Sequence, residues 1–456
     1  MTATFDSPVA APVAAPWRVP VARGYRFELV KLVSQWRVRL LFLVSWLGPG
    51  LLVAGVAKQG TLPSDTPFGR WLHASGWAAP LVGLGFAGMY ALPLLTSVVA
   101  GDVFAAEDRL GTWRHLLVAV RSPRRIFAAK ALASLTVILV LFVGLPASSA
   151  LGGVLAVGNR PLIGLDGHVL APGDAAVKVF LAWACALAPT LALAAIGLLG
   201  SVILGRSPIG LLLPAIVGLG MQGLQILPIP VALRFAIPGY AFIAWHGLFT
   251  SPTQLGPLLI SVAVSLAWAV AATALAYRAF VRRDFTSPTY DGGGRRILLA
   301  GILPMAVVLG LTIAVVVVAA PRTTGSGIEQ PKLERSLATE FAHLYRVQTQ
   351  QLHRPDVTEA QLQAIAACDK GGGLEENSGP GNGWRCTVTW HLPGVTAVGQ
   401  AVYQLDVTPD GKYIADGDGP REVNGYFLVR TPTGDAANPL WQFDGVVDLL
   451  ETAPKG

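Results

Sequence analysis

Seven long apolar segments, separated by short polar stretches, dominate the first 320 residues of this chain. A helix needs about 20 apolar residues to cross the hydrocarbon core of a bilayer, and these segments are about that long. Soluble chains carry about 25% charged residues, whereas only 13% of the residues here are charged and 53% are hydrophobic. The sequence therefore predicts a polytopic α-helical membrane protein.

Seven membrane spans follow from these segments. We place them at residues 40–57, 79–100, 131–157, 176–204, 209–227, 258–281 and 297–320. The first six form one domain over residues 40–281. A loop at 282–296 connects this domain to the seventh span.

One further apolar run, at residues 231–249, is interrupted by Pro238 and Gly239. Non-helical backbone at membrane depth is tolerated only where protein or a water-filled cavity covers it. We therefore expect a re-entrant or interfacial hairpin on the outer face. An ordinary additional span is the alternative, because a broken run of this length is borderline for crossing.

Lys and Arg are concentrated in alternate connecting segments. If the hairpin does not cross, eighteen of them fall on the side of the N-terminus and five in the short segments on the other side. Such an excess marks cytoplasmic loops. The N-terminus and the loop at 101–130 are thus predicted to be cytoplasmic, and the C-terminal part outside. Basic residues beside apolar runs indicate topology and contact with a lipid bilayer, not nucleic-acid binding.

The N-terminal region has two parts. Residues 1–22 are rich in Ala, Pro and Val and read as a disordered cytoplasmic tail. Residues 23–39 alternate charged and apolar side chains at helical spacing, which predicts an amphipathic helix along the inner leaflet. The alternative is a simple cytoplasmic extension of the first span.

Residues 321–456 carry 11 Lys/Arg and 17 Asp/Glu, in contrast to the basic membrane part. Helices are predicted at 333–351 and 358–368. Strands are predicted at 384–391, 400–407, 412–415, 425–430 and 441–450, where apolar and polar residues alternate. We expect a soluble, extracytoplasmic α+β domain in which a disulfide between Cys368 and Cys386 ties the second helix to the first strand.

Catalytic and metal-binding motifs are missing from the sequence. There is no G-x-x-x-x-G-K-[ST] phosphate loop, no H-E-x-x-H and no metal-spaced Cys/His set. We therefore expect a non-catalytic chain with no metal and no cofactor of its own.

Ionisable groups are nearly absent from the predicted spans, which argues against a proton- or sodium-driven carrier. Three polar residues remain, Gln222 and Gln225 on one helix face and His246 in the hairpin. They are candidates for a substrate path. The alternative is interhelical hydrogen bonding, which commonly joins spanning helices.

The loop at 101–130 carries the strongest motif. Its pattern consists of Phe104-Ala105-Ala106-Glu107, Arg109, Gly111-Thr112, Leu116-Leu117, Pro123-Arg124 and Lys130. With the amphipathic helix before the first span, the six-span count and the outer hairpin, it resembles the permease subunit of ABC transporters of the type-2 exporter class. The resemblance covers residues 26–281, and the seventh span and outer domain are additions to the family's core.

The resemblance implies a bacterial inner-membrane permease that pairs with a second copy or a paralogue. A separate ATP-binding subunit, holding ATP and Mg, would dock on the loop at 101–130 and drive export of a hydrophobic or amphipathic substrate. The implied coupling residues are Glu107, Arg109, Gly111, Thr112, Arg114 and Arg124, and those of the connecting helix are Arg26, Glu28 and Lys31. The alternative function is a membrane-anchored sensor or envelope-assembly factor that acts through its outer domain.

Glu107 is expected to act as a structural anchor and not as a catalytic acid. It would cap the N-terminus of a neighbouring helix or pair with a basic residue such as Arg26 or Lys31. Either contact would keep the loop rigid enough to transmit force.

Overall fold

The computed structural model describes residues 20–59, 67–205, 208–285, 293–319, 325–432 and 434–450. Most of the predicted N-terminal tail lies outside these residues. Within them, seven helical segments are long and apolar enough to cross a membrane. They are α2 (Trp36–Gln59), α4-η1-α5 (Ala78–Phe86, Ala87–Ala91, Leu92–Val99), α8 (Pro123–Ala156), α9 (Pro172–Ile203), α10 (Pro208–Ile226), α12 (Leu255–Val281) and α13-η4-α14 (Gly294–Ile297, Leu298–Ile302, Leu303–Ala319). A multi-pass helical membrane protein with a C-terminal β-sheet domain is thereby confirmed.

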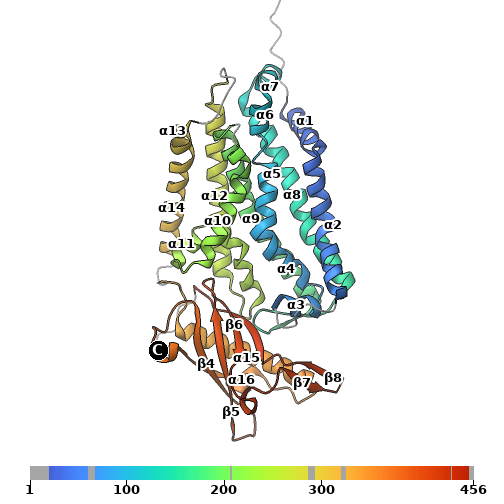
Figure 1. The fold of residues 1–456 in the computed structure, drawn as a ribbon, viewed down its shortest axis with the longest axis vertical. Coiled ribbons are helices and arrows are strands. Elements are labelled where there is room, and N and C mark those ends of the chain that lie inside the picture. Colours follow the sequence, from blue (N-terminus) through green and yellow to red (C-terminus); the bar gives the residue numbers. More distant parts are fainter. Residues whose placement is uncertain are drawn as a thin grey trace, which may run out of the picture.

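The two ends of the helix bundle differ. Helices α1 (Val21–Ser34), α6 (Ala105–Leu110), α7 (Trp113–Val120) and α13 lie at one end, and the C-terminal domain lies at the other (Figure 1). The loop at 101–130 is therefore as far from the C-terminal domain as the bundle allows. This arrangement agrees with the alternation of basic and non-basic segments along the chain.

The third span begins earlier than the sequence indicated. Helix α8 starts at Pro123, after Ser122 in an extended conformation, so the last part of the loop at 101–130 is helical. Proline suits the first helical position because the amide there has no intrahelical partner. The prediction placed the start of this span by apolar content alone, so the basic residues that follow Pro123 were not included in the helix.

The predicted amphipathic helix is divided at Gln35, which is extended, and the chain continues as α2. Both parts run beside α8. A Cβ on Gly24 would lie 3.2 Å from that of Ala129, and one on Gly152 would lie 2.5 Å from the Cα of Gly50. Since α8 is continuous, α1 follows the same helix as α2 and so extends the first span. This packing favours the alternative, in which the helix is an extension of the first span.

The broken apolar run forms three short helices, α11 (Val231–Phe235), η2 (Pro238–Phe242) and η3 (Ala244–Phe249). It is not among the seven candidate spans. Helix η2 packs against α9, α10 and α12, so protein covers its irregular backbone. A short hairpin, β1 (Leu162–Ile163) with β2 (Val169–Leu170), occupies the polar loop between α8 and α9 and was not predicted. Helix α3 (Pro67–Ala74) lies between the first two spans.

The C-terminal domain is an antiparallel sheet with one long helix. The strands are β3 (Ile365–Lys370), β4 (Gly381–His391), β5 (Val398–Val407), β6 (Lys412–Gly417) and β9 (Gln442–Val446), in the order β3-β4-β5-β6-β9. Helix α15 (Gln330–Gln351) buries Leu337 and Phe341 against this sheet, with the Phe341 and Trp390 rings 4.7 Å apart. The remaining elements are α16 (Glu359–Leu362), η5 (Gly371–Gly373), α17 (Arg421–Asn424) and the hairpin of β7 (Leu428–Thr431) with β8 (Gly434–Ala437).

The disulfide between Cys368 and Cys386 is present, but the predicted helix at 358–368 is wrong beyond its first turn. Thr358 and Gln361 form the expected capping box, and α16 then ends at Leu362. Cys368 lies on β3, directly opposite Cys386 on β4. The bond therefore joins two neighbouring strands, not a helix and a strand.

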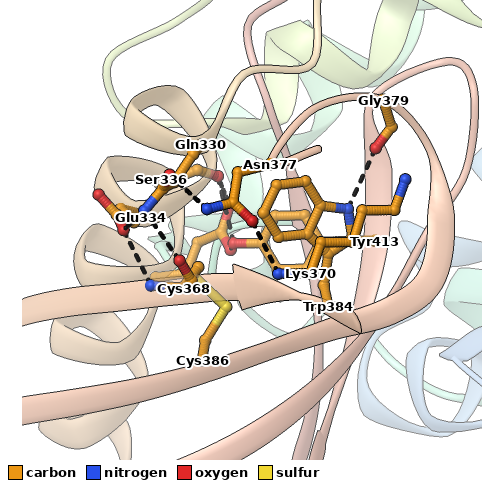
Figure 2. The surroundings of a disulfide bond; sticks show 11 residues. Gln330, Glu334, Ser336, Cys368, Lys370, Asn377, Gly379, Trp384, Cys386 and Tyr413 are labelled. Carbon is orange, nitrogen blue, oxygen red and sulfur yellow. Dashed lines mark hydrogen bonds between the residues drawn. A yellow bond between two sulfur atoms is a disulfide. The ribbon is translucent and has the colours of Figure 1, made fainter. Parts of the chain in front are cut away.

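Strand β3 is an edge of the sheet, and α15 covers its free side. The Cys368 amide donates to Glu334 Oε1 at 2.8 Å, and Gln330 Nε2 donates to the Cys368 carbonyl at 2.8 Å (Figure 2). Such side-chain contacts occupy backbone groups that would otherwise be open to pairing with another chain. The disulfide and these contacts fix the start of α15 to the sheet.

The disulfide gives a prediction for thiol chemistry. Denatured but unreduced protein should take up one alkylating group, at Cys185, and reduced protein three. Replacing Cys368 and Cys386 together by Ser should lower the stability of the C-terminal domain by about 3 kcal/mol, because a cross-link of this span restricts the unfolded chain. Mass spectrometry and thermal melting check both statements. Three modified thiols before reduction would contradict the first.

Candidate functional site

Three acidic side chains of the 101–130 segment are buried at the end of the bundle: Asp102, Glu107 and Asp108. We call them the carboxylate cluster. An isolated buried carboxylate costs several kcal/mol, so each must be paired. Their partners come from four separate parts of the chain, and these pairs hold the loop to the bundle.

Glu107 is the centre of the largest network. Lys130 on α8 donates to Glu107 Oε1 at 2.7 Å, and Lys31 on α1 and the Thr112 hydroxyl also donate to this carboxylate. Lys130 is itself only 1% exposed and makes a second ion pair, at 2.9 Å, with Glu28 on α1. The pairing of Glu107 with Lys31 is confirmed. Its major partner, Lys130, was recognised only as part of the motif.

The surroundings of Glu107 keep it ionised. Burial alone would raise the pKa of the Glu107 carboxyl, but Lys130, Lys31 and Thr112 together lower it from 4.5 to about 2. A carboxylate with such a pKa holds no proton at neutral pH and is unsuited to general acid catalysis. This agrees with the expectation that Glu107 is an anchor.

Asp102 and Asp108 tie the loop to two further segments. Arg37 on α2 donates to Asp102 at 2.8 Å, and Arg109 pairs with the other oxygen of the same carboxylate. Arg283, just beyond α12, donates to Asp108 through both terminal nitrogens, one of them at 2.9 Å. Bidentate arginine–carboxylate pairs are among the most directional ion pairs. The sequence reading had assigned no role to either carboxylate or to Arg283.

An aromatic layer lies beneath the carboxylate cluster. The Phe104 ring is 5.4 Å from Phe127 and 5.0 Å from Phe280, and Trp113 is 5.4 Å from Phe280. Trp113 also donates its indole N–H to Asp108 at 2.7 Å. This layer packs the start of α7 against α8 and α12, so the loop cannot shift without disturbing the spans below it.

Two backbone features shape the loop. Gly111 ends α6 in the left-handed region, at φ +67°, where a residue with a Cβ is strained. The amides of Phe104 and Ala105 donate to the Ser201 hydroxyl on α9 at 3.0 and 2.9 Å. Nothing in the apolar pattern around Ser201 distinguishes it from other small residues of spanning helices, so sequence reasoning missed it.

The outward surface of the loop is basic and apolar. Arg114, Arg121 and Arg124 are exposed, and beside them Leu110 and Val118 are 68% and 72% exposed. Arg109 is 40% exposed while its guanidinium pairs with Asp102. Charged rims around exposed apolar side chains are typical of protein interaction sites.

The predicted connecting-helix residues divide between two faces of α1. Glu28 and Lys31 point toward α8 and join the Glu107 network, whereas Arg26 is exposed. The apolar residues Phe27 and Val30 are also exposed, at 58% and 62%. The charged face of α1 is thus turned inward to the protein and its apolar face outward.

The predicted substrate-path residues each contact different neighbours. Gln222 on α10 donates a hydrogen bond to the Gly239 carbonyl of η2 at 3.4 Å. This bond joins two segments of the membrane part, as expected if Gln222 serves packing and not a substrate path. The side-chain amide of Gln225 is buried without a hydrogen-bond partner. His246 packs against Trp245, with ring centroids 4.3 Å apart.

Among the described residues, no group of three or more His, Cys, Asp or Glu side chains is placed to hold a metal ion. Comparison with protein-family models and with curated proteins returned no match to this chain.

Loss of the Glu107 carboxylate should destabilise the end of the bundle that carries the loop at 101–130. Glu107→Ala leaves Lys130 buried with one partner instead of two, and breaking a buried pair costs about 3 kcal/mol. The melting temperature in detergent should fall clearly. Arg114→Ala, on the exposed surface of the same loop, should change stability by less than about 0.5 kcal/mol. Equal melting temperatures for the wild type and Glu107→Ala would show that the network does not hold the loop.

The lowered pKa of Glu107 predicts a pH dependence. Because this pKa lies below the unfolded value of 4.5, the ionised carboxylate stabilises the fold above that pH, and the contribution is lost as the pH falls toward 2. Melting temperatures measured from about pH 6 to about pH 3 should decline in the wild type. The decline should be shallower in Glu107→Gln, which cannot ionise. Parallel curves would contradict the assignment.

Proposed function

We propose that this chain is the transmembrane permease subunit of an ATP-driven exporter of the type-2 ABC class. A separate ATP-binding subunit, which carries ATP and Mg, docks on the loop at 101–130 and supplies the energy. The chain itself is non-catalytic. Its N-terminus faces the cytoplasm of a bacterial cell and its C-terminal domain lies outside the inner membrane.

The observation that carries this proposal is the anchoring of the loop. A basic and apolar outer surface sits on a carboxylate cluster whose partners lie on α1, α2, α8 and beyond α12. A force applied to the exposed arginines therefore reaches at least three spans through buried ion pairs. A loop that only connected two spans would need neither the buried charges nor the aromatic layer.

The lipid-facing surfaces support a dimeric permease. Only 11% of the apolar stretch of α2 is buried inside the chain, and the side chains of Leu43, Leu47 and Leu51 on this helix are exposed. A spanning helix so little covered by its own chain has room for a second copy or a paralogue beside it. The remaining apolar surface would face lipid.

A charge-reversal variant tests the docking surface. Arg114→Glu, Arg121→Glu and Arg124→Glu together should reduce retention of an ATP-hydrolysing subunit by about tenfold or more, because opposed like charges cost several kcal/mol at an interface. ATP hydrolysis of the complex purified from native membranes in mild detergent measures this retention. The matched control is Arg160→Glu, an exposed arginine at the opposite end of the bundle.

The control should retain full ATP hydrolysis. If the wild-type chain itself retains no ATP-hydrolysing subunit, the exporter proposal fails and the sensor or assembly function takes its place. If the triple variant retains as much activity as the wild type, the subunit docks elsewhere.

A further inference from the structure

His343 lies where the C-terminal domain meets the membrane part. It is on α15 and is buried, with 6% of its surface exposed. At Gly167 of the β1–β2 hairpin, an added Cβ would lie 2.6 Å from Leu344 Cγ and 3.3 Å from His343 Cβ, so the two parts touch closely at this point. Water has little access to the ring, and buried polar atoms of this kind normally find their partners within the protein.

Both ring nitrogens of His343 face oxygen atoms. Nδ1 lies 2.9 Å from the backbone carbonyl oxygen of Asp166 and 3.5 Å from Oδ2 of the same residue. Nε2 lies 3.3 Å from Oε2 of Glu359 on α16. A carbonyl group and an ionised carboxylate accept hydrogen bonds and do not donate them. A neutral imidazole has one N–H group and one lone pair, so in that form one of its nitrogens would present a lone pair to an acceptor oxygen.

Titratable and charged groups on three elements surround this ring. The hairpin contributes Asp166 and also His168, whose ring centroid lies 6.0 Å away. Helix α16 contributes Glu359, which also pairs with Arg346 of α15 at 3.5 Å. One turn earlier on α15, burial holds the pKa of the Glu340 carboxyl well above its usual range, which favours the uncharged form of that group. The ring is therefore flanked by two carboxylates, one from each part of the protein.

We propose that His343 is a proton-dependent clasp between the C-terminal domain and the membrane part. With both nitrogens protonated, the ring donates to the Asp166 carbonyl and attracts the carboxylates of Asp166 and Glu359. When one proton is lost, a lone pair faces one of these oxygens and the attraction to the carboxylates disappears. Imidazole side chains change charge between about pH 5 and about pH 8. The clasp is therefore closed on the acidic side of this range and weakened on its alkaline side.

The clasp lies at the end of the bundle opposite to the loop at 101–130 (Figure 1). Its groups all belong to this chain, so its operation needs no ATP-binding subunit. It makes the seating of the C-terminal domain respond to the acidity of the compartment that this domain faces, whatever the chain transports.

The protonation of the ring can be measured directly. Nitrogen-15 NMR of the full chain in lipid nanodiscs, labelled at histidine, distinguishes a ring with two N–H groups from a ring with one. The signals of His343 are those that are lost in His343→Gln. We expect both nitrogens of His343 to carry protons at about pH 6 and only one of them at about pH 9. A ring with one proton at about pH 6, or with two at about pH 9, overturns the clasp.

Hydrogen exchange measures how the seating of the domain responds. After correction for the intrinsic exchange rate at each pH, amides of the hairpin at 162–170 should open about tenfold more often at about pH 8.5 than at about pH 6, as expected for the loss of one contact to a charged group. His343→Gln should remove this difference, because an amide does not titrate. Glu359→Gln should reduce it, since its amide can donate to a neutral ring. The matched control is His353→Gln, at an exposed histidine just after the same helix, which should keep the wild-type difference.

Equal opening of the hairpin at both pH values in the wild type overturns the proposal. So does a pH dependence that is the same in the wild type, His343→Gln and Glu359→Gln. If His343→Gln does not fold, Glu359→Gln decides alone, because it keeps the histidine and its contact with Asp166. The chain is measured without an ATP-binding subunit, so these outcomes are separate from those of the docking test.

Discussion

The ion pairs around Lys130 hold together the end of the molecule that we assign to the cytoplasm. An ammonium group that is 1% exposed is costly to bury, and here Glu28 from α1 and Glu107 from α6 both compensate it. The first turns of α8 therefore depend on contacts with two segments that are distant in sequence. Removing a partner from such a group is more disruptive than removing a surface ion pair, which contributes about 0–1 kcal/mol.

The same arrangement explains why a charged segment can lie rigidly against a largely apolar bundle. Glu107, Asp102 and Asp108 each find a base on a different element, and the aromatic layer fills the space below them. The arginines left outside are free to present a basic surface without carrying the fold. Structure and interaction are thus divided between the inner and outer faces of one short segment.

The opposite end of the molecule, where the C-terminal domain meets the bundle, is held by different contacts. The C-terminal domain meets the membrane part at the β1–β2 hairpin, where His343 contacts the Asp166 carbonyl, and just before α12, where Gln254 donates to the Val446 carbonyl. Beside these contacts lies a hollow of about 410 Å³ with predominantly apolar walls. The bundle therefore separates an end held by buried ion pairs from an end where the two parts of the protein enclose a hollow.

The local sequence pattern was enough to predict the membrane spans and several ends of helices. Apolar run length fixed seven spans, Pro238 and Gly239 broke the run that does not form one, and the capping box at Thr358 began α16 where predicted. Tertiary structure decided the rest. Whether Glu107 pairs with Arg26, Lys31 or Lys130, whether Cys368 sits on a helix or a strand, and which carboxylates are buried all depend on distant segments. Charge and periodicity describe single elements, whereas burial and pairing are properties of the packed chain.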